Sequence, residues 1–268
     1  MCSSVKRPAS RAVLYGMYSS LLGGCRYVNA LRYRGDRFEC PFCGGRFSRF
    51  LPKGKDVPVL RENRVIGGGY RLNAACPRCN SRDRERLVYL YLKHERSGLF
   101  SQTAKLLHIA PEKNLRAIFL SCPNLDYLAA DLSSPLAEVR MDVTDIGHED
   151  DTFDVIICNH VLEHIPDDAK AMRECFRVLK KGGFAILQVP ISCVIKETLE
   201  NPSITSPGDR EKAFGQKDHV RIYGEDYASR LEKAGFSVTA YDFISKMNAH
   251  DVRKYGLLEN EKIYLCSK

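Results

Sequence analysis

Four cysteines in two closely spaced pairs are the residues of this chain with the clearest chemistry. They are Cys40, Cys43, Cys76 and Cys79. Two Cys-x-x-Cys pairs supply four thiolates, which complete the tetrahedral coordination of one zinc ion and leave no position open for a substrate. Gly44 and Gly45 follow the first pair and permit the left-handed turn that aims backbone amides at the sulfurs. We therefore predict a structural zinc site in a small zinc-ribbon-like module, rather than two disulfides or four free thiols.

The other cysteines and the apolar pattern indicate the compartment. The chain has 11 cysteines, and those outside the two pairs follow no motif spacing. Several lie in apolar runs, where a free thiol acts as a small hydrophobic side chain, so we expect a cytoplasmic, reducing environment. The chain has no run of about eighteen apolar residues, so no membrane span is expected. Residues 12–22 make a poor signal-peptide core and are expected to form a short helix on the zinc-binding module.

Strands and helices alternate from residue 104 onward. Short apolar runs predict strands at 106–109, 125–130, 154–158, 184–189, 236–243 and 262–266. Amphipathic patterns predict helices at 81–94, 113–120, 168–179 and 227–234. We expect Ser81 to cap the first of these helices and Lys180–Gly183 to close the third. The alternation predicts an α/β fold with a doubly wound, mostly parallel sheet, whose ligands bind beyond the carboxyl ends of the strands.

Charge divides the chain at nearly the same place. Residues 1–104 hold 20 Lys and Arg against 7 Asp and Glu, a net charge of +13, whereas residues 105–268 hold 21 against 26, a net charge of −5. We predict a basic N-terminal helical segment at 1–35, the zinc-ribbon-like module with its following helix at 36–100, and the α/β domain at 104–268. A positive module favours contact with nucleic acid, with an anionic small substrate or with the acidic domain of its own chain.

Two stretches of the α/β domain resemble a known family. They resemble the second half of a class I S-adenosylmethionine-dependent methyltransferase of the type 11-like group. Their sequences are FDVIICNHVLEHI at 153–165 and RVLKKGG at 177–183. The resemblance covers residues 104–268 and implies a Rossmann-like sheet of seven strands whose last strand is antiparallel. With the cysteine pairs ahead of it and HIAPE at 108–112, the layout resembles a bacterial subgroup that has a four-cysteine zinc-ribbon-like module. The implied cofactor is S-adenosylmethionine.

The first of the implied cofactor-binding positions departs from the family pattern. Most members have an acidic residue and a Gly-x-Gly turn after the first strand, where this chain has His108, Ala110 and Pro111. Ala110 is small enough for close approach of the cofactor's methionine part, and Pro111 suits the start of a helix. We expect Glu112 to substitute for the usual carboxylate. The alternative is a fold that no longer binds the cofactor.

Two further pairs of neighbouring residues follow the family pattern. Asp131 and Leu132 end the second strand, where a carboxylate accepts hydrogen bonds from both ribose hydroxyls. Asp142 and Val143 resemble the family's third motif. By that resemblance, the Asp142 carboxylate accepts from the adenine amino group and the Val143 amide donates to the ring.

The resemblance places the end of the fourth strand beside the transferring methyl group. His160 is the candidate general base there, since the pKa of an imidazole is near neutral. Asn159 is expected to contact the cofactor and to orient a substrate hydroxyl or amine. His164 is a second candidate, although in the family it is as often a packing residue.

A polar segment at about 190–218 is too long for an ordinary connection, and we interpret it as a substrate lid. It leads into His219, Arg221 and Tyr223, which share one side of the chain if the segment is extended. Together they would suit an anionic or hydroxylated substrate. The alternative is that Arg221 pairs with an acid of the lid.

We predict a methyltransferase that acts on a small or carrier-bound metabolite, such as a sugar, a lipid-linked or a natural-product intermediate. One alternative is an RNA methyltransferase whose basic zinc module binds phosphates, although that module lacks a run of exposed aromatic residues for base stacking. The other is a non-enzymatic zinc-ribbon interaction protein with a degenerate methyltransferase fold, which Asp131 and Asp142 oppose. Arg82, Arg84 and Arg86 are expected to offer cations to the substrate or to dock the acidic domain.

Overall fold

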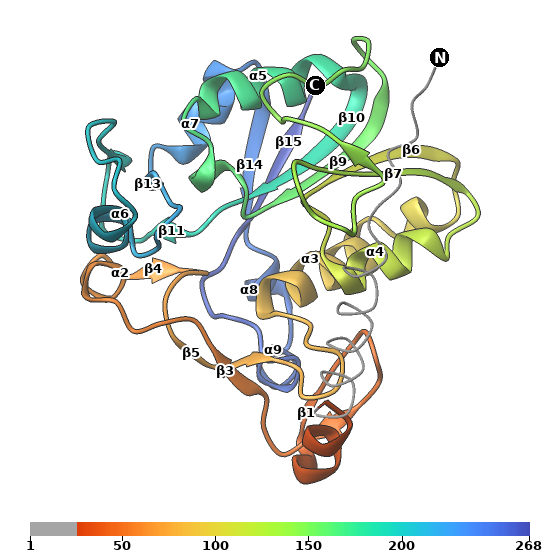
Figure 1. The fold of residues 1–268 in the computed structure, drawn as a ribbon. Helices are drawn as coiled ribbons and strands as arrows, with labels where there is room; N and C mark the ends of the chain where they lie inside the picture. Colours follow the sequence, from red (N-terminus) through yellow and green to blue (C-terminus); the bar gives the residue numbers. More distant parts are fainter. Residues whose placement is uncertain (1–25) are drawn as a thin grey trace, which may run out of the picture.

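A seven-stranded, mostly parallel sheet lies at the centre of the protein (Figure 1). The computed structural model describes residues 26–268. The strand order is β14 (Ser237–Tyr241), β15 (Ile263–Ser267), β10 (Leu179–Gln188), β9 (Phe153–Asn159), β6 (Ala104–Ile109), β7 (Leu125–Asp131) and β8 (Val139–Arg140). The strands from β10 to β8 are parallel, and β15 runs antiparallel to both of its neighbours. The predicted fold class and the antiparallel last strand are confirmed.

Apolar side chains on both faces of the sheet explain why helices cover both. In β9, every residue except Asp154 is buried, as expected for a central parallel strand. One face forms a hydrophobic cluster with α5 (Asp168–Val178) and α7 (Tyr227–Lys233). The opposite face packs against α3 (Asp83–Glu95), α4 (Lys113–Leu120), α8 (Phe243–Lys246) and α9 (Ala249–Lys254). The central strands and helices lie within a few residues of their predicted positions.

Two predicted helix ends differ in the structure. Helix α5 ends at Val178, and β10 begins at the next residue, so the expected C-terminal cap at 180–183 is wrong. Gly182 (φ +77°) instead lies in an irregularity of β10 between Leu179 and Phe184. The left-handed glycine therefore belongs to a bulge-like irregularity in the strand and does not cap the helix. At the start of α3 the N-cap is Arg82 rather than Ser81, whose side chain is fully buried.

The N-terminal module is built from short strands around a small core. Residues 26–32 are helical, and the strands are β1 (Arg34–Glu39), β2 (Arg46–Phe47), β3 (Leu51–Lys53) and β5 (Arg71–Ala75), paired β1 with β2 and β3 with β5. Its buried core contains three phenylalanines and two of the paired cysteines, namely Phe38, Phe47, Phe50, Cys40 and Cys76. The predicted helix at 12–22 lies outside the described residues, as do Cys2 and Cys25.

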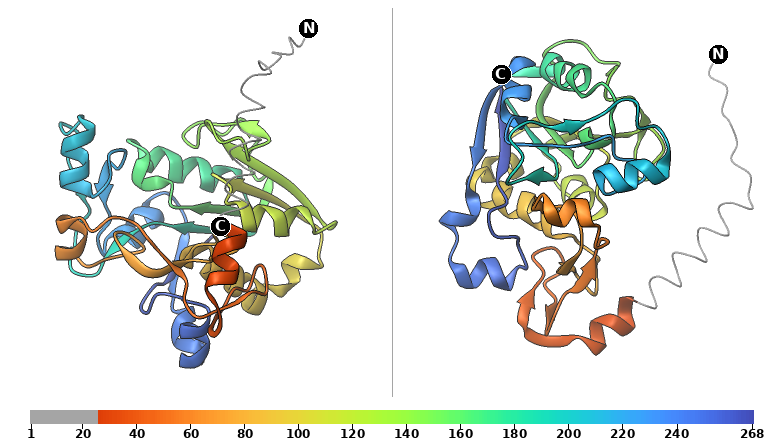
Figure 2. Two further views of the ribbon diagram at one scale, coloured as in Figure 1. Left: turned by 60° about the horizontal axis from the view of Figure 1, so that its bottom comes forward. Right: turned by 90° about the vertical axis from the view of Figure 1, so that its left-hand side faces the viewer.

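The N-terminal module also contacts the segment predicted to be a lid. Strand β4 (Val65–Ile66) pairs with β11 (Ile191–Ser192), and α2 (Pro58–Glu62) packs against α6 (Pro207–Phe214). Strands β12 (Leu199–Glu200) and β13 (Arg221–Ile222) pair with each other, so the segment is structured. Among the described residues, short 3₁₀ helices lie at Ser97–Phe100 and Leu162–His164. Figure 2 shows the red-to-orange module at one end of the sheet domain.

Within residues 26–268, no helix combines the length and the apolar character needed to cross a bilayer.

Candidate functional site

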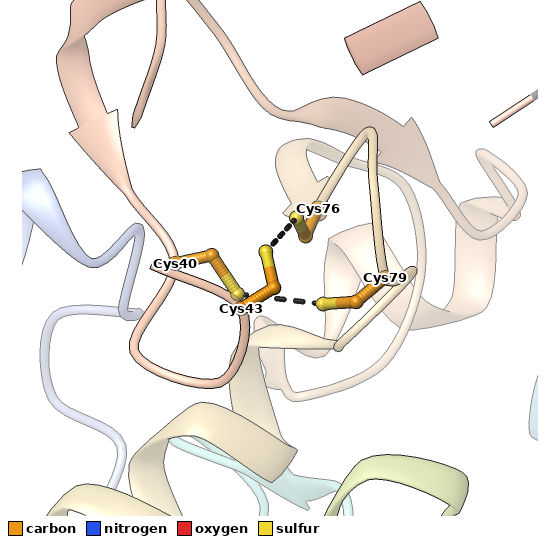
Figure 3. Close-up of side chains that lie close together, drawn as sticks. All are labelled: Cys40, Cys43, Cys76 and Cys79. Carbon is orange, nitrogen blue, oxygen red and sulfur yellow. Dashed lines mark hydrogen bonds between the residues drawn. The ribbon is translucent and has the colours of Figure 1, made fainter. Parts of the chain in front are cut away.

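The four paired cysteines converge on one point from two separate turns (Figure 3). All four sulfurs lie within 4.8 Å of one another. The Sγ atoms of Cys40 and Cys79 are 3.4 Å apart, and those of Cys43 and Cys76 are 3.7 Å apart. A zinc ion bonded to four sulfurs at about 2.3 Å would set neighbouring sulfurs about 3.8 Å apart, so the spacing fits this metal. The distances are too long for disulfides, whose S–S bond is about 2.05 Å.

One backbone turn is repeated in both cysteine pairs. The amide of Gly44 donates to the carbonyl of Cys40, and the amide of Asn80 donates to the carbonyl of Cys76, each at 2.9 Å. Gly44 (φ +64°) and Asn80 (φ +62°) are both left-handed. Glycine adopts this conformation freely and asparagine more readily than most residues. The left-handed turn predicted at Gly44 is confirmed, and Asn80 is its equivalent in the second pair.

The predicted cofactor-binding residues meet at the carboxyl edge of the sheet. Ile109 at the end of β6 is in register with Ala130 of β7 and Cys158 of β9. The next residues along these strands are Ala110, Asp131 and Asn159, and the amide of Ala110 donates to the carbonyl of Ala130 at 2.8 Å. These residues therefore line the edge where ligands of such sheets bind.

Two non-glycine residues at this edge adopt left-handed backbone. They are Ala110 (φ +50°), after β6, and His160 (φ +58°), after β9. This conformation costs an L-residue roughly 1–2 kcal/mol, and such strain concentrates at functional sites. The turn after β6 thus keeps the backbone geometry for which glycine is usually selected, although this chain has alanine there.

His108 supports a carboxylate at this edge. Its side chain is fully buried, with Nδ1 3.0 Å from the Tyr127 hydroxyl and Nε2 2.9 Å from Glu112 Oε2. Asn159 Nδ2 donates to the other oxygen, Glu112 Oε1, at 2.6 Å. Glu112 is therefore fixed between the ends of β6 and β9. The sequence raised Glu112 only as a substitute acid, because its partners become adjacent only when the two strands pair.

Asp131 and Asp142 each keep part of their carboxylate for a ligand. Asp131 Oδ1 accepts from the amides of Ser133 (2.7 Å) and Ser134 (2.6 Å). Asp142 Oδ1 accepts from the amide and hydroxyl of Thr144, both at 2.8 Å, and these hydrogen bonds lower the pKa of Asp142. The turn at Thr144 therefore favours the ionised, hydrogen-bond-accepting form of Asp142. Val143 beside Asp142 is buried, whereas Leu132 beside Asp131 is half exposed.

A cavity of about 430 Å³ lies between the N-terminal module and the end of β9. The module contributes Gly67–Gly69 and three arginines, and the sheet domain contributes His160, Glu163, His164 and the segment 215–219. At Gly67 (φ +77°), an added Cβ would lie 3.2 Å from His160 Cε1. The glycine run therefore packs directly on the candidate base, and the module forms one wall of the cavity.

His160 keeps one ring nitrogen without a partner. It is 8% exposed, its Nδ1 lies 3.4 Å from Glu163 Oε1, and within the described residues its Nε2 has no hydrogen-bond partner. Burial lowers the pKa of His160 well below its ordinary value and raises the pKa of Glu163 to about 8. Burial therefore keeps the imidazole neutral, and in the tautomer with the proton on Nδ1 the buried Nε2 is a hydrogen-bond acceptor.

Three arginines after the second cysteine pair have different surroundings. Arg86 is fully buried and donates to backbone carbonyls, including that of Gly256 at 2.9 Å, so it docks the module on the sheet domain. Arg82 and Arg84 line the cavity. Neither has an ion-pair partner within residues 26–268, and Arg84 Nε is buried without a hydrogen-bond partner there. The docking role expected of these arginines therefore holds for Arg86, whereas a contact of Arg82 and Arg84 with a substrate stays a prediction.

The segment 219–223 does not present its three polar side chains to one cavity. Of the three, only His219 lines it. Arg221 is buried; its Nε donates to Glu200 Oε2 at 2.8 Å and its other nitrogens donate to carbonyls of the 162–166 turn. The Tyr223 hydroxyl donates to Asp168 at 2.7 Å. Carbonyls at the end of a short 3₁₀ turn lack helical partners, and Arg221 satisfies them. The alternative, in which Arg221 pairs with an acid of the 190–218 segment, is confirmed.

Comparison with known proteins finds a family match in the sheet domain. Residues 98–187 match the family described as Methyltransferase domain. A rice 2-methyl-6-phytyl-1,4-hydroquinone methyltransferase is 28% identical over 120 residues, covering 45% of this chain and 32% of that protein. A ubiquinone biosynthesis O-methyltransferase of Ralstonia nicotianae is 38% identical over 76 residues, covering 26% and 31%. The chain spans about a third of the length of these relatives.

Solved structures resemble about two thirds of the chain. A SAM dependent methyltransferase from Archaeoglobus fulgidus has a TM-score of 0.42 at 15% identity and covers 68% of this chain and 93% of that chain. A methyltransferase from Mesorhizobium loti has a TM-score of 0.44 at 14% identity and covers 66% and 97%. The strand order and the family match over residues 98–187 support a class I methyltransferase domain in the C-terminal part of the chain.

Proposed function

We propose that this protein is an S-adenosylmethionine-dependent methyltransferase that acts on a small or carrier-bound metabolite, and that its four paired cysteines hold a structural zinc ion. The observation that carries the proposal is the edge of the sheet. There Asp131 and Asn159 end strands β7 and β9, Ala110 directly follows β6 between them, and Asp142 lies beyond the edge strand β8. The names of the curated relatives, which are quinone-type methyltransferases, favour a small-molecule acceptor.

The cofactor would bind across these strand ends. The free carboxylate oxygen of Asp131 would accept from the ribose hydroxyls. Asp142 would accept from the adenine amino group, while the Val143 amide donates to the ring and Leu132 covers its apolar surface. The turn of Ala110 and Pro111 would admit the methionine part, with His108 acting through Glu112.

The reaction class is a direct displacement. When bound at these residues, S-adenosylmethionine would supply an electrophilic methyl carbon for displacement by the acceptor atom, with S-adenosylhomocysteine as the leaving group. His160 would take the acceptor proton at its unpartnered Nε2. Asn159 would orient the acceptor beside the cofactor, and the cavity walls would exclude water.

Replacement of Asp131 by alanine tests the cofactor site. Two hydrogen bonds to a charged group contribute about 1.5–3 kcal/mol each, and part of this is recovered by water, so binding should weaken about a hundredfold. The measurement is calorimetric titration with S-adenosylmethionine and S-adenosylhomocysteine. Asp126→Ala is the matched control, because Asp126 lies on the same strand but is exposed. Absence of binding by the folded wild type, or equal binding by both variants, would contradict the proposal.

The acceptor would carry an anionic group. Arg82 and Arg84 line the cavity and have no ion-pair partner in the described part of the chain. A phosphate or carboxylate of the acceptor would satisfy both guanidinium groups.

Inorganic phosphate is the probe for the proposed binding of an anionic group by Arg82 and Arg84. We expect phosphate to raise the unfolding temperature of the wild type more than sodium chloride of equal ionic strength does. The Arg82→Ala, Arg84→Ala double variant should lose at least half of the phosphate-specific rise, because its cavity has lost two of its cations. An equal rise in both proteins would show that phosphate binds elsewhere.

The two alternative functions have less support. The RNA alternative rests on the basic charge of the module alone: Arg34, Arg37 and Arg49 are exposed, whereas Arg86 is buried and Arg71 is paired with Asp83. A degenerate fold would lose the turn geometry after β6, which Ala110 retains. Membership of the zinc-ribbon subgroup rests on the four clustered cysteines and the HIAPE stretch.

A further inference from the structure

We infer that Glu163, His164 and His219 form a second metal site, for a divalent zinc-like ion, in the wall of the cavity beside His160. One ligand atom from each of the three lies within 4.8 Å of the others. Two come from the 3₁₀ turn 162–164 and the third follows the 190–218 segment, so the site ties these segments together. Two imidazoles and one carboxylate suit a divalent first-row ion such as zinc.

The buried carboxylate of Glu163 points to a missing ligand. Its side chain is 2% exposed, and within the described residues Oε2 has no hydrogen-bond partner. Its Oε1 lies 3.4 Å from His160 Nδ1 and 3.9 Å from His164 Nε2. A buried carboxylate oxygen without a partner is costly, and a cation bound at Oε2 would remove that cost.

The surroundings of the histidines match those of metal ligands. His164 Nδ1 lies 3.3 Å from Asp218 Oδ2, while its Nε2 is the atom on the Glu163 side. A carboxylate on the far nitrogen of a ligating histidine orients the ring and strengthens it as a ligand. The rings of His164 and His219 meet edge to face with centroids 4.6 Å apart, so each ring restricts the orientation of the other.

The position facing the cavity would remain open. His164 is 32% exposed and lines the cavity together with His219 and Arg84. Three protein ligands leave the fourth position of a tetrahedral ion to water or substrate. Arg84 and Arg71 add positive charge near the site, which Asp218 offsets in part, and Glu163 would add a negative charge when a bound cation displaces its proton. If the proposed function holds, the ion and Arg84 would together hold an acceptor that carries a negatively charged oxygen.

The stoichiometry of zinc tests this site independently of methyl transfer. The full chain, saturated with zinc and dialysed against metal-free buffer, should hold two zinc ions in the wild type and one in His219→Ala, by elemental analysis. Glu163→Gln keeps the side-chain shape and should also reduce the content to one. His250→Ala is the control, because His250 is exposed and pairs with its own neighbour Asp251.

Cobalt distinguishes the two sites by spectroscopy. Co²⁺ added to protein that holds one zinc in its cysteine site should give visible absorption without thiolate charge transfer, and His219→Ala should lose it. One zinc per wild-type chain, or a second zinc that persists in both His219→Ala and Glu163→Gln, would overturn the inference. S-adenosylmethionine binding measured on the same samples separates this outcome from failure of the proposed function.

Discussion

Replacement of Cys76 by serine should abolish zinc binding at the cysteine site and unfold the N-terminal module. The module core consists of three phenylalanines and two of the four cysteines, so the proposed metal is a large part of what holds it together. Structural zinc contributes roughly 10–16 kcal/mol in small zinc-binding peptides, more than the whole stability of a typical domain. Backbone amides of residues 34–75 should then exchange with solvent at close to unfolded rates, as measured by hydrogen-exchange mass spectrometry.

Cys193→Ser is the matched control for this experiment. Cys193 is an exposed free thiol outside the cluster, so its replacement should leave zinc content and exchange unchanged. The effect of Cys76→Ser should extend to the cavity wall, because Gly67–Gly69 belong to the same module. A Cys76→Ser variant that keeps a full equivalent of zinc at the cysteine site, or keeps its slow exchange, would refute a structural role for the metal.

The sheet was predictable because its pattern is local. The apolar run that forms β9 is recognisable in the sequence, and so are the amphipathic pattern of α5 and the acidic residue at the end of β7. The number of strands and the antiparallel last strand followed from the family resemblance, whereas the strand order is known only from the structure. The two cysteine pairs indicated their own convergence, since four thiolates in two tight turns have few other stable arrangements in a reducing compartment.

The composition of the cavity was not predictable in the same way. Glu163 was seen only as part of a family motif, because nothing local shows that its carboxylate is buried beside two histidines. Arg221 was expected in the pocket on alternation alone. Alternation of side chains in an extended segment predicts on which side of the chain Arg221 lies, but the backbone carbonyls of the 162–166 turn determine where its guanidinium binds. Likewise, the contact of Gly67 with His160 exists only once the module has docked.

The docking of the module depends on one buried side chain, Arg86. Its guanidinium donates to the carbonyls of Asn73, Ala74 and Ser81 in the module, and to those of Tyr255 and Gly256 in the sheet domain. It also lies 4.5 Å from the centre of the Phe50 ring. Burial lowers the pKa of Arg86, whereas Asp83 and the thiolates Cys40, Cys76 and Cys79 oppose this shift. A zinc ion with four thiolates carries a charge of about −2, so the guanidinium offsets part of that charge.

Arg86→Met should therefore destabilise the whole protein by about 3–5 kcal/mol. The methionine fills much of the volume, but the buried carbonyls lose their donors and the cysteine cluster loses a neighbouring cation. For a chain of this size, the unfolding temperature should fall by about 10 °C in calorimetry. Arg86→Lys restores the charge but only part of the hydrogen bonding, so it should recover less than half of the loss. Arg78→Met, at an exposed arginine beside Cys79, should change stability by less than about 0.5 kcal/mol. If Arg86→Met and Arg78→Met unfold at the same temperature, the module does not depend on Arg86, and its docking rests on its other contacts, among them the β4–β11 pairing and the packing of α2 on α6.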